Sequence, residues 1–175
     1  LQLVADGSKA SLQLDAAAPV SAYLPVPAGK AIKGTLSRDG KTSALDLSVA
    51  PGEFATVFAL QDAKGIQQRV VREQPDDFNA LKASLAFVNL DPTCKDASLR
   101  PAGRTAELFK NAPEASVQRR SINPVKLSVQ LVCANATVGN PLDLGELKPG
   151  ERYSVLLLPT ANGPQLIAAT DTLSN

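Results

Sequence analysis

The sequence predicts an all-β protein made of two small antiparallel β-sandwich domains in tandem, joined by a short linker. Three observations lead to this prediction. Apolar and polar residues alternate over short segments, which is the pattern of strands with one buried face. Thirteen prolines and eleven glycines divide the chain at intervals typical of sandwiches and barrels. The chain also contains an internal repeat.

The expected strands follow one another at short intervals. Residues 11–14 and 44–49 alternate between apolar and polar side chains. The clearest case is 125–131, VKLSVQL, in which the valines and leucines face one way and the lysine, serine and glutamine face the other. This pattern indicates antiparallel strands that keep one face in water.

The repeat joins a turn to an apolar strand. Residues 45–60 read LDLSVAPGEFATVFAL, and residues 142–158 read LDLGELKPGERYSVLLL. In each copy the Pro-Gly turn suits a positive φ at the glycine, and the strand after it is apolar enough to be central in its sheet. The beginnings also match, because LQLV at 1–4 parallels LAFV at 85–88.

Two copies of one β unit imply two domains. We predict domain boundaries of 1–74 and 82–175, with a polar, turn-rich linker at about 75–81. The main helical candidate, Pro75 to Lys82, falls on this linker, and its acidic residues suit a first helical turn. The alternative is one sandwich whose hairpins happen to share the same turn chemistry.

Charge and composition exclude several kinds of function. Lys and Arg number 18 and Asp and Glu 17, for a net charge of +1, whereas nucleic-acid binding needs a concentrated basic surface. The chain has no histidine, the usual general base and commonest transition-metal ligand. Lysine can replace histidine as a base, but neither Ser-x-x-Lys nor Gly-x-Ser-x-Gly occurs. We therefore expect no catalytic residues and no cofactor.

The remaining candidate ligands are weak. Asp91, Cys94 and Asp96 form a loose cluster in the sequence that mixes hard and soft ligands, and we expect no metal site there. The only adjacent acidic pair, Asp76-Asp77, is more typical of solvated surface than of paired catalytic carboxylates. Asn135-Ala136-Thr137 fits the glycosylation sequon, a tripeptide that is frequent by chance.

The two cysteines, Cys94 and Cys133, suit either a single disulfide or two buried thiols. A bridge would close a loop of about 40 residues, worth roughly 4 kcal/mol on the chain-entropy model. The disulfide requires an oxidising compartment.

The ends of the sequence suggest a processed product. Residue 1 is Leu, and no basic region followed by an apolar run comes after it, so we expect a mature or trimmed chain. No stretch approaches the roughly 20 apolar residues of a membrane helix. We therefore expect no membrane span.

One charged segment stands at the entry to the clearest strand. Arg119, Arg120 and Lys126 surround an Asn-Pro turn formed by Asn123 and Pro124. The segment is either a solvated loop or a recognition edge, since arginine favours interfaces and pairs with carboxylates.

The same segment carries a family resemblance. Residues 120–129, RSINPVKLSV, resemble the Ile-Asn-Pro-Val-Lys segment of the AlgF family of accessory proteins in bacterial alginate O-acetylation. The order of elements is similar over most of the chain. This sequence departs from the family in its Cys94/Cys133 pair, its longer insertion around Asp91–Asp96 and its missing N-terminal residues.

The resemblance implies a periplasmic, non-catalytic protein with two β-sandwich domains. Its implied role is that of an adaptor working with a membrane O-acyltransferase and a periplasmic O-acetyltransferase. Related accessory proteins serve acetylated cellulose, so the polymer stays open between alginate and cellulose. The residues expected to bind a partner are Arg119, Arg120, Ile122, Asn123, Pro124 and Lys126.

Two other functions remain open. A carbohydrate-binding module would hold the polysaccharide near the acetylation enzymes, but it needs an aromatic platform or a basic groove, and the chain has only two tyrosines and five phenylalanines. An acetyl esterase would need a nucleophile and a base, which the sequence does not offer.

Overall fold

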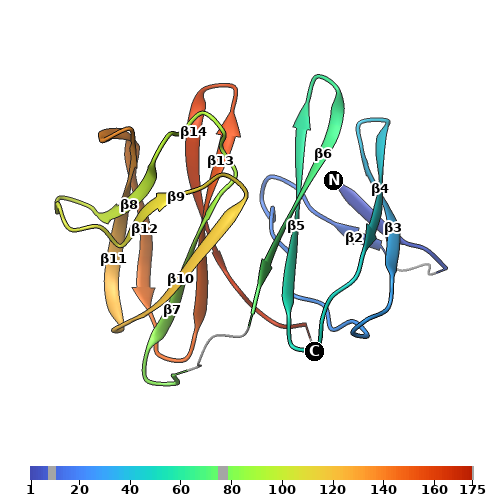
Figure 1. The fold of residues 1–175 in the computed structure, drawn as a ribbon, viewed down its shortest axis with the longest axis horizontal. Helices are drawn as coiled ribbons and strands as arrows, with labels where there is room; N and C mark the ends of the chain where they lie inside the picture. The colour runs from blue at the N-terminus through green and yellow to red at the C-terminus, as the bar shows by residue number, and fades with distance from the viewer. Residues whose placement is uncertain (8–10, 75–78, 175) are drawn as a thin grey trace. The chain divides into compact units, whose positions relative to one another are not determined.

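Strands are the only regular elements in the part of the chain that the computed structural model describes, residues 1–7, 11–74 and 79–174. This confirms the predicted all-β class (Figure 1). In chain order the strands are β1 (Gln2–Ala5), β2 (Ser11–Gln13), β3 (Ile32–Arg38), β4 (Lys41–Leu47), β5 (Phe54–Asp62), β6 (Gly65–Glu73), β7 (Ala83–Asn89), β8 (Ala97–Pro101), β9 (Phe109–Ala112), β10 (Ser116–Ile122), β11 (Val125–Cys133), β12 (Ala136–Leu147), β13 (Arg152–Thr160) and β14 (Gly163–Thr170).

The chain divides into two compact units. Unit 1 comprises Leu1–Pro75 together with Leu173–Asn175, and unit 2 comprises Asp76–Thr172. The chain end groups with unit 1, where Leu173 forms a parallel bridge with Tyr23. This differs from the expected boundaries, which left the whole C-terminal end in the second domain.

Unit 1 contains a four-stranded sheet, in the order β2-β1-β3-β4, and a separate two-stranded hairpin, β5-β6. The strands pair antiparallel throughout. Its core is small. The buried apolar residues are Leu36, Leu45, Val49, Ile66 and Val71.

Unit 2 contains two four-stranded sheets, β10-β7-β13-β14 and β12-β11-β8-β9. The sequence had predicted antiparallel pairing throughout, but in unit 2 β7 and β13 run parallel. All seven residues of β7 are buried, as expected for a strand covered on both faces. Phe87, Leu99, Val129, Val155 and Leu157 belong to the core that both sheets share.

The internal repeat is present in the strand pairing as well as in the sequence. The sheet order β2-β1-β3-β4 of unit 1 matches β9-β8-β11-β12 of unit 2. Leu3 pairs with Leu36 in unit 1, as Leu99 pairs with Leu131 in unit 2. The predicted match between residues 1–4 and 85–88 was therefore wrong. β1 takes the position of β8, and β7 has no counterpart among the described strands of unit 1.

The two hairpins that follow the Pro-Gly turns are also equivalent. Gly52 and Gly150 both have a φ of +76°, so the predicted turn conformation is confirmed. Thr56 pairs with Val71 where Ser154 pairs with Ala169. The strand after the turn was expected to be central in both copies. This holds for β13, which lies between β7 and β14, but not for β5, which pairs with β6 alone.

Of the two alternatives for the cysteines, the structure has the disulfide, since Cys94 is bonded to Cys133. It ties the connection between β7 and β8 to the end of β11.

Of the predicted helix, residues 75–78 lie outside the described residues. Asn79 to Lys82 form a turn, in which the Lys82 N–H donates to the Asn79 carbonyl at 2.9 Å. No helix in the described ranges is long and apolar enough to cross a membrane.

Candidate functional site

The Ile-Asn-Pro-Val segment forms a tight connection between the two sheets of unit 2. Ile122 ends β10 opposite Ala83 of β7, and Val125 begins β11 opposite Leu147 of β12. Asn123 and Pro124 lie between them. Proline fixes its own φ and favours an extended conformation for the residue before it, which suits an abrupt change of sheet.

The turn is held by a side chain from the segment that precedes β7. The Lys82 ammonium donates a hydrogen bond to the Asn123 side-chain oxygen. The residue before Lys82, Leu81, is 78% exposed. Val125 is 47% exposed. Two large apolar side chains, one next to Lys82 in the chain and the other two residues after Asn123, are therefore exposed to water.

The predicted cations separate into two groups. Arg120 and Lys126 are exposed. The Arg120 guanidinium donates to the Leu108 carbonyl at 2.9 Å, which fixes its direction and leaves other N–H donors for a partner. We use the name turn surface for exposed residues in this segment together with Leu81, namely Leu81, Arg120, Asn123, Val125 and Lys126.

Arg119 does not belong to the turn surface. Its side chain is only 8% exposed and forms an ion pair with Asp171 at 2.9 Å. The same guanidinium donates to the Ser84 hydroxyl and the Tyr153 carbonyl, both at 3.3 Å, and Ser154 also donates to Asp171, at 2.9 Å. Arg119 thus connects β10 with β7, β13 and the end of β14. These contacts give it a structural role, and its expected role in binding a partner stays a prediction.

Sequence reasoning missed the residues that bury Arg119. Ser84, Ser154 and Asp171 are far apart in the chain and carry no motif. They meet because β7 and β13 run parallel, which places Arg152 opposite Ser84 and Ser154 opposite Ala86. Only knowledge of that pairing would have identified them.

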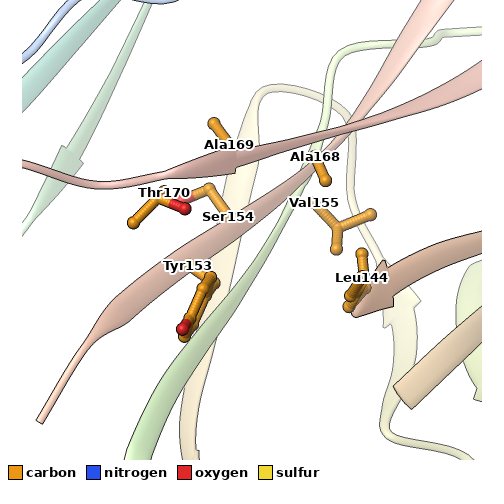
Figure 2. A pocket seen from close by; sticks show the side chains of 7 residues that line it. All are labelled: Leu144, Tyr153, Ser154, Val155, Ala168, Ala169 and Thr170. Atoms are coloured by element: carbon orange, nitrogen blue, oxygen red, sulfur yellow. The ribbon is translucent and has the colours of Figure 1, made fainter. Parts of the chain in front are cut away.

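A small pocket lies at one side of the unit 2 sandwich, with a volume of about 100 Å³. Figure 2 shows its lining side chains, which come from β12, β13 and β14. The Tyr153 hydroxyl donates to Glu151 and accepts from the Lys148 N–H at 3.0 Å. Burial, followed by the hydrogen bond to Glu151, raises the pKa of Tyr153 above its usual 10.0. Ligand pockets usually measure about 300–1,000 Å³, so this pocket suits water better than a substrate.

In the cluster of Asp91, Cys94 and Asp96, the weak metal candidate in the sequence, two of the side chains have other partners in the structure. Cys94 is in the disulfide, and thus has no thiolate to offer a metal. Asp91 is 1% exposed, and its Oδ1 accepts hydrogen bonds from the Thr93 N–H at 2.7 Å and the Thr93 hydroxyl at 2.6 Å. In the described ranges no group of three or more acidic, cysteine or histidine side chains could hold a metal ion.

Aromatic side chains do not form an exposed platform in the part of the chain that the structure describes. Phe87 and Phe109 are buried, and the other described aromatic residues, Tyr23, Phe54, Phe58 and Tyr153, are half-buried. Tyr23 packs edge-on against Phe54, with ring centroids 5.2 Å apart.

These features define a class of protein: an all-β chain of two units that share a repeated sheet and hairpin. The second unit contains a disulfide and has exposed cationic and apolar residues around a turn. No family model and no curated protein sequence matches the chain. One similar solved structure is the C-terminal domain of AlgF from P. aeruginosa, with 21% sequence identity and a TM-score of 0.41. That match covers 51% of this chain and 98% of the AlgF domain.

Proposed function

We propose that this protein is a non-catalytic periplasmic adaptor, which binds acetyltransferase components during O-acetylation of a secreted exopolysaccharide, either alginate or cellulose. Its partners would be a periplasmic O-acetyltransferase and a membrane O-acyltransferase. The observation that carries the proposal is the turn surface, which coincides with the segment that resembles the AlgF family.

The chemistry of the turn surface suits a protein partner. Leu81 and Val125 offer apolar area that becomes favourable once it is removed from water. Arg120 and Lys126 are exposed in the same segment, and arginine is enriched in binding hot spots. A complementary partner would present carboxylates around an apolar patch.

Two further features support the proposal. The disulfide between Cys94 and Cys133 is suited to an oxidising compartment such as the periplasm. The chain has no histidine, so it lacks the side chain that most often transfers protons in acyl-transfer enzymes.

The test is charge reversal on the turn surface. The double variant Arg120→Glu/Lys126→Glu should retain at most one tenth of the wild-type capture of the co-expressed periplasmic O-acetyltransferase in a pull-down. Arg119 is left unchanged, because a glutamate there would face Asp171 inside unit 2 and disturb the fold.

The matched control is Lys95→Glu/Arg104→Glu, which changes the same charge at two exposed positions of the same unit. It should capture the enzyme like the wild type. Undiminished capture by the turn variant would remove the turn surface from the proposal, as would an equal loss in the control.

Titration calorimetry separates the adaptor from a carbohydrate-binding module. The purified chain should show no heat of binding with mannuronate or cello-oligosaccharides. Saturable binding to either, without any enzyme present, would replace the adaptor role by direct binding of the polymer.

A further inference from the structure

The outer edge of β5 has no neighbouring strand among the described residues. β5 pairs with β6 along its whole length, and these two strands form a sheet of their own. In an antiparallel pair, alternate residues direct their backbone N–H and C=O groups away from the partner strand. Between Ala55 and Gln61, the described backbone hydrogen bonds outside the sheets include none from β5. This edge therefore offers a row of hydrogen-bonding groups.

The equivalent edge in unit 2 is occupied. β13 takes the position of β5 in the repeated hairpin, and its outer edge pairs in parallel with β7 from Arg152↔Ser84 to Leu157↔Asn89. The pairing buries β7 completely. Because the hairpins share their register, unit 2 shows which kind of strand the β5 edge fits: an extended, mostly apolar segment that runs parallel to β5.

The composition of β5 also indicates a covered edge. Exposed edge strands usually carry charges, prolines or bulges that prevent pairing with other chains. β12, an edge strand of unit 2, contains Gly139, Pro141 and Gly145 and two register shifts. β5 reads ATVFAL from Ala55 to Leu60, without charge, proline or a break in register.

We propose that the outer edge of β5 is a strand-acceptor site, which binds an extended segment of another polypeptide in parallel, with the apolar character of β7. The described strands of this chain do not supply that segment, because β7 is buried between β10 and β13 in unit 2. Backbone hydrogen bonds would give the affinity, and the half-buried side chains of β5 would select apolar residues. This inference is independent of the adaptor role in acetylation.

The experiment uses the full chain, labelled with ¹⁵N, and a synthetic peptide with the sequence of β7, Ala83–Asn89, flanked by lysines for solubility. Titration should give saturable amide shifts between Ala55 and Gln61, and amide exchange there should slow at least tenfold on saturation. Unit 2 provides an internal control: Val155 and Leu157 should not shift, since their strand already has both neighbours.

Two control peptides distinguish strand addition from apolar adhesion. A peptide with the same composition in scrambled order, and one N-methylated at alternate residues so that its hydrogen-bonding edge is blocked, should both leave β5 unchanged. Equal shifts with the N-methylated peptide would overturn the proposal, as would the absence of any shift in β5 at millimolar concentrations of the native sequence.

Discussion

The two units of this chain contain the same sheet and the same hairpin, but they bury them to different extents. β13 has four fully buried residues in succession, whereas β5 has none and its apolar residues are half-buried. The largest side chains with almost no exposure, among them Phe87, Leu131 and Leu157, are all in unit 2. The cause is the pair of additional strands, β7 and β10, which complete the second sheet of unit 2.

The comparison extends to single hydrogen bonds. In unit 2 the segment after β9 carries Arg119, whose guanidinium lies 3.5 Å from the Ser154 hydroxyl. In unit 1 the segment after β2 carries Tyr23, whose hydroxyl lies 2.8 Å from that of Thr56, the counterpart of Ser154. Equivalent positions on the hairpin are therefore held by a buried ion pair in one unit and by a neutral hydrogen bond in the other.

This difference predicts the largest effect. Arg119→Ala leaves Asp171 buried without its partner and should destabilise unit 2 by about 3–5 kcal/mol. Tyr23→Phe removes one neutral hydrogen bond and should cost unit 1 about 0.5–1.5 kcal/mol. Native-state hydrogen exchange, followed by NMR, measures the two units separately. Equal losses in both units would show that the ion pair contributes no more than the tyrosine.

A matched pair of valines tests the difference in burial. Val155 is 0% exposed and Val57, at the same position of the repeat, is half-buried. Val155→Ala should destabilise unit 2 by about 2 kcal/mol, from lost transfer free energy and the cavity left behind. Val57→Ala should cost unit 1 less than about 1 kcal/mol. Urea unfolding of each unit measures its loss of unfolding free energy. A larger loss for Val57→Ala than for Val155→Ala would contradict the difference in burial between the two units.

The smallest effect concerns pH. The pKa of Tyr153 is raised above 10.0, so the folded state favours the protonated phenol. The resulting stability of unit 2 is complete below pH 10 and is lost as the pH rises through the higher folded pKa. Tyr153→Phe should remove this part of the alkaline loss, which is measured as the urea midpoint of unit 2 between pH 9 and 12.

The control for that prediction is in unit 1, where an alanine, Ala55, takes the position of Tyr153. The Tyr153→Phe variant keeps every other side chain of unit 2, so their contributions cancel in the comparison with the wild type. An alkaline profile of unit 2 that is identical with and without the tyrosine hydroxyl would contradict the assignment.

Local chemistry explains why much of the fold was predictable. Alternation identified the strands, and the Pro-Gly turns identified the repeated hairpin, because both depend on neighbouring residues. Alternation does not show which strands share an edge. The parallel pairing of β7 with β13 joins distant segments, so the repeat was aligned from the wrong beginning and β5 was wrongly predicted to be central.

Two adjacent residues of the candidate site also show how far the sequence alone could predict their surroundings. Arg119 and Arg120 are neighbours on one strand, so their side chains point to opposite faces. Both were nevertheless predicted to bind a partner. The position of Asp171 at the end of β14 explains why Arg119 is buried, whereas Arg120 is exposed.

The parallel pairing also has a consequence for how the chain acquires its structure. Leu85 of β7 pairs with Tyr153 of β13, which lies much later in the chain. The second edge of β7 therefore stays unpaired until β13 has been synthesised and has docked. Pairings between such distant segments form slowly, and a strand that is mostly apolar, as β7 is, is prone to self-association until it is paired. We therefore expect the hairpin of β13 and β14 to dock late in the folding of unit 2, and until it does, β10 is the strand that pairs with β7.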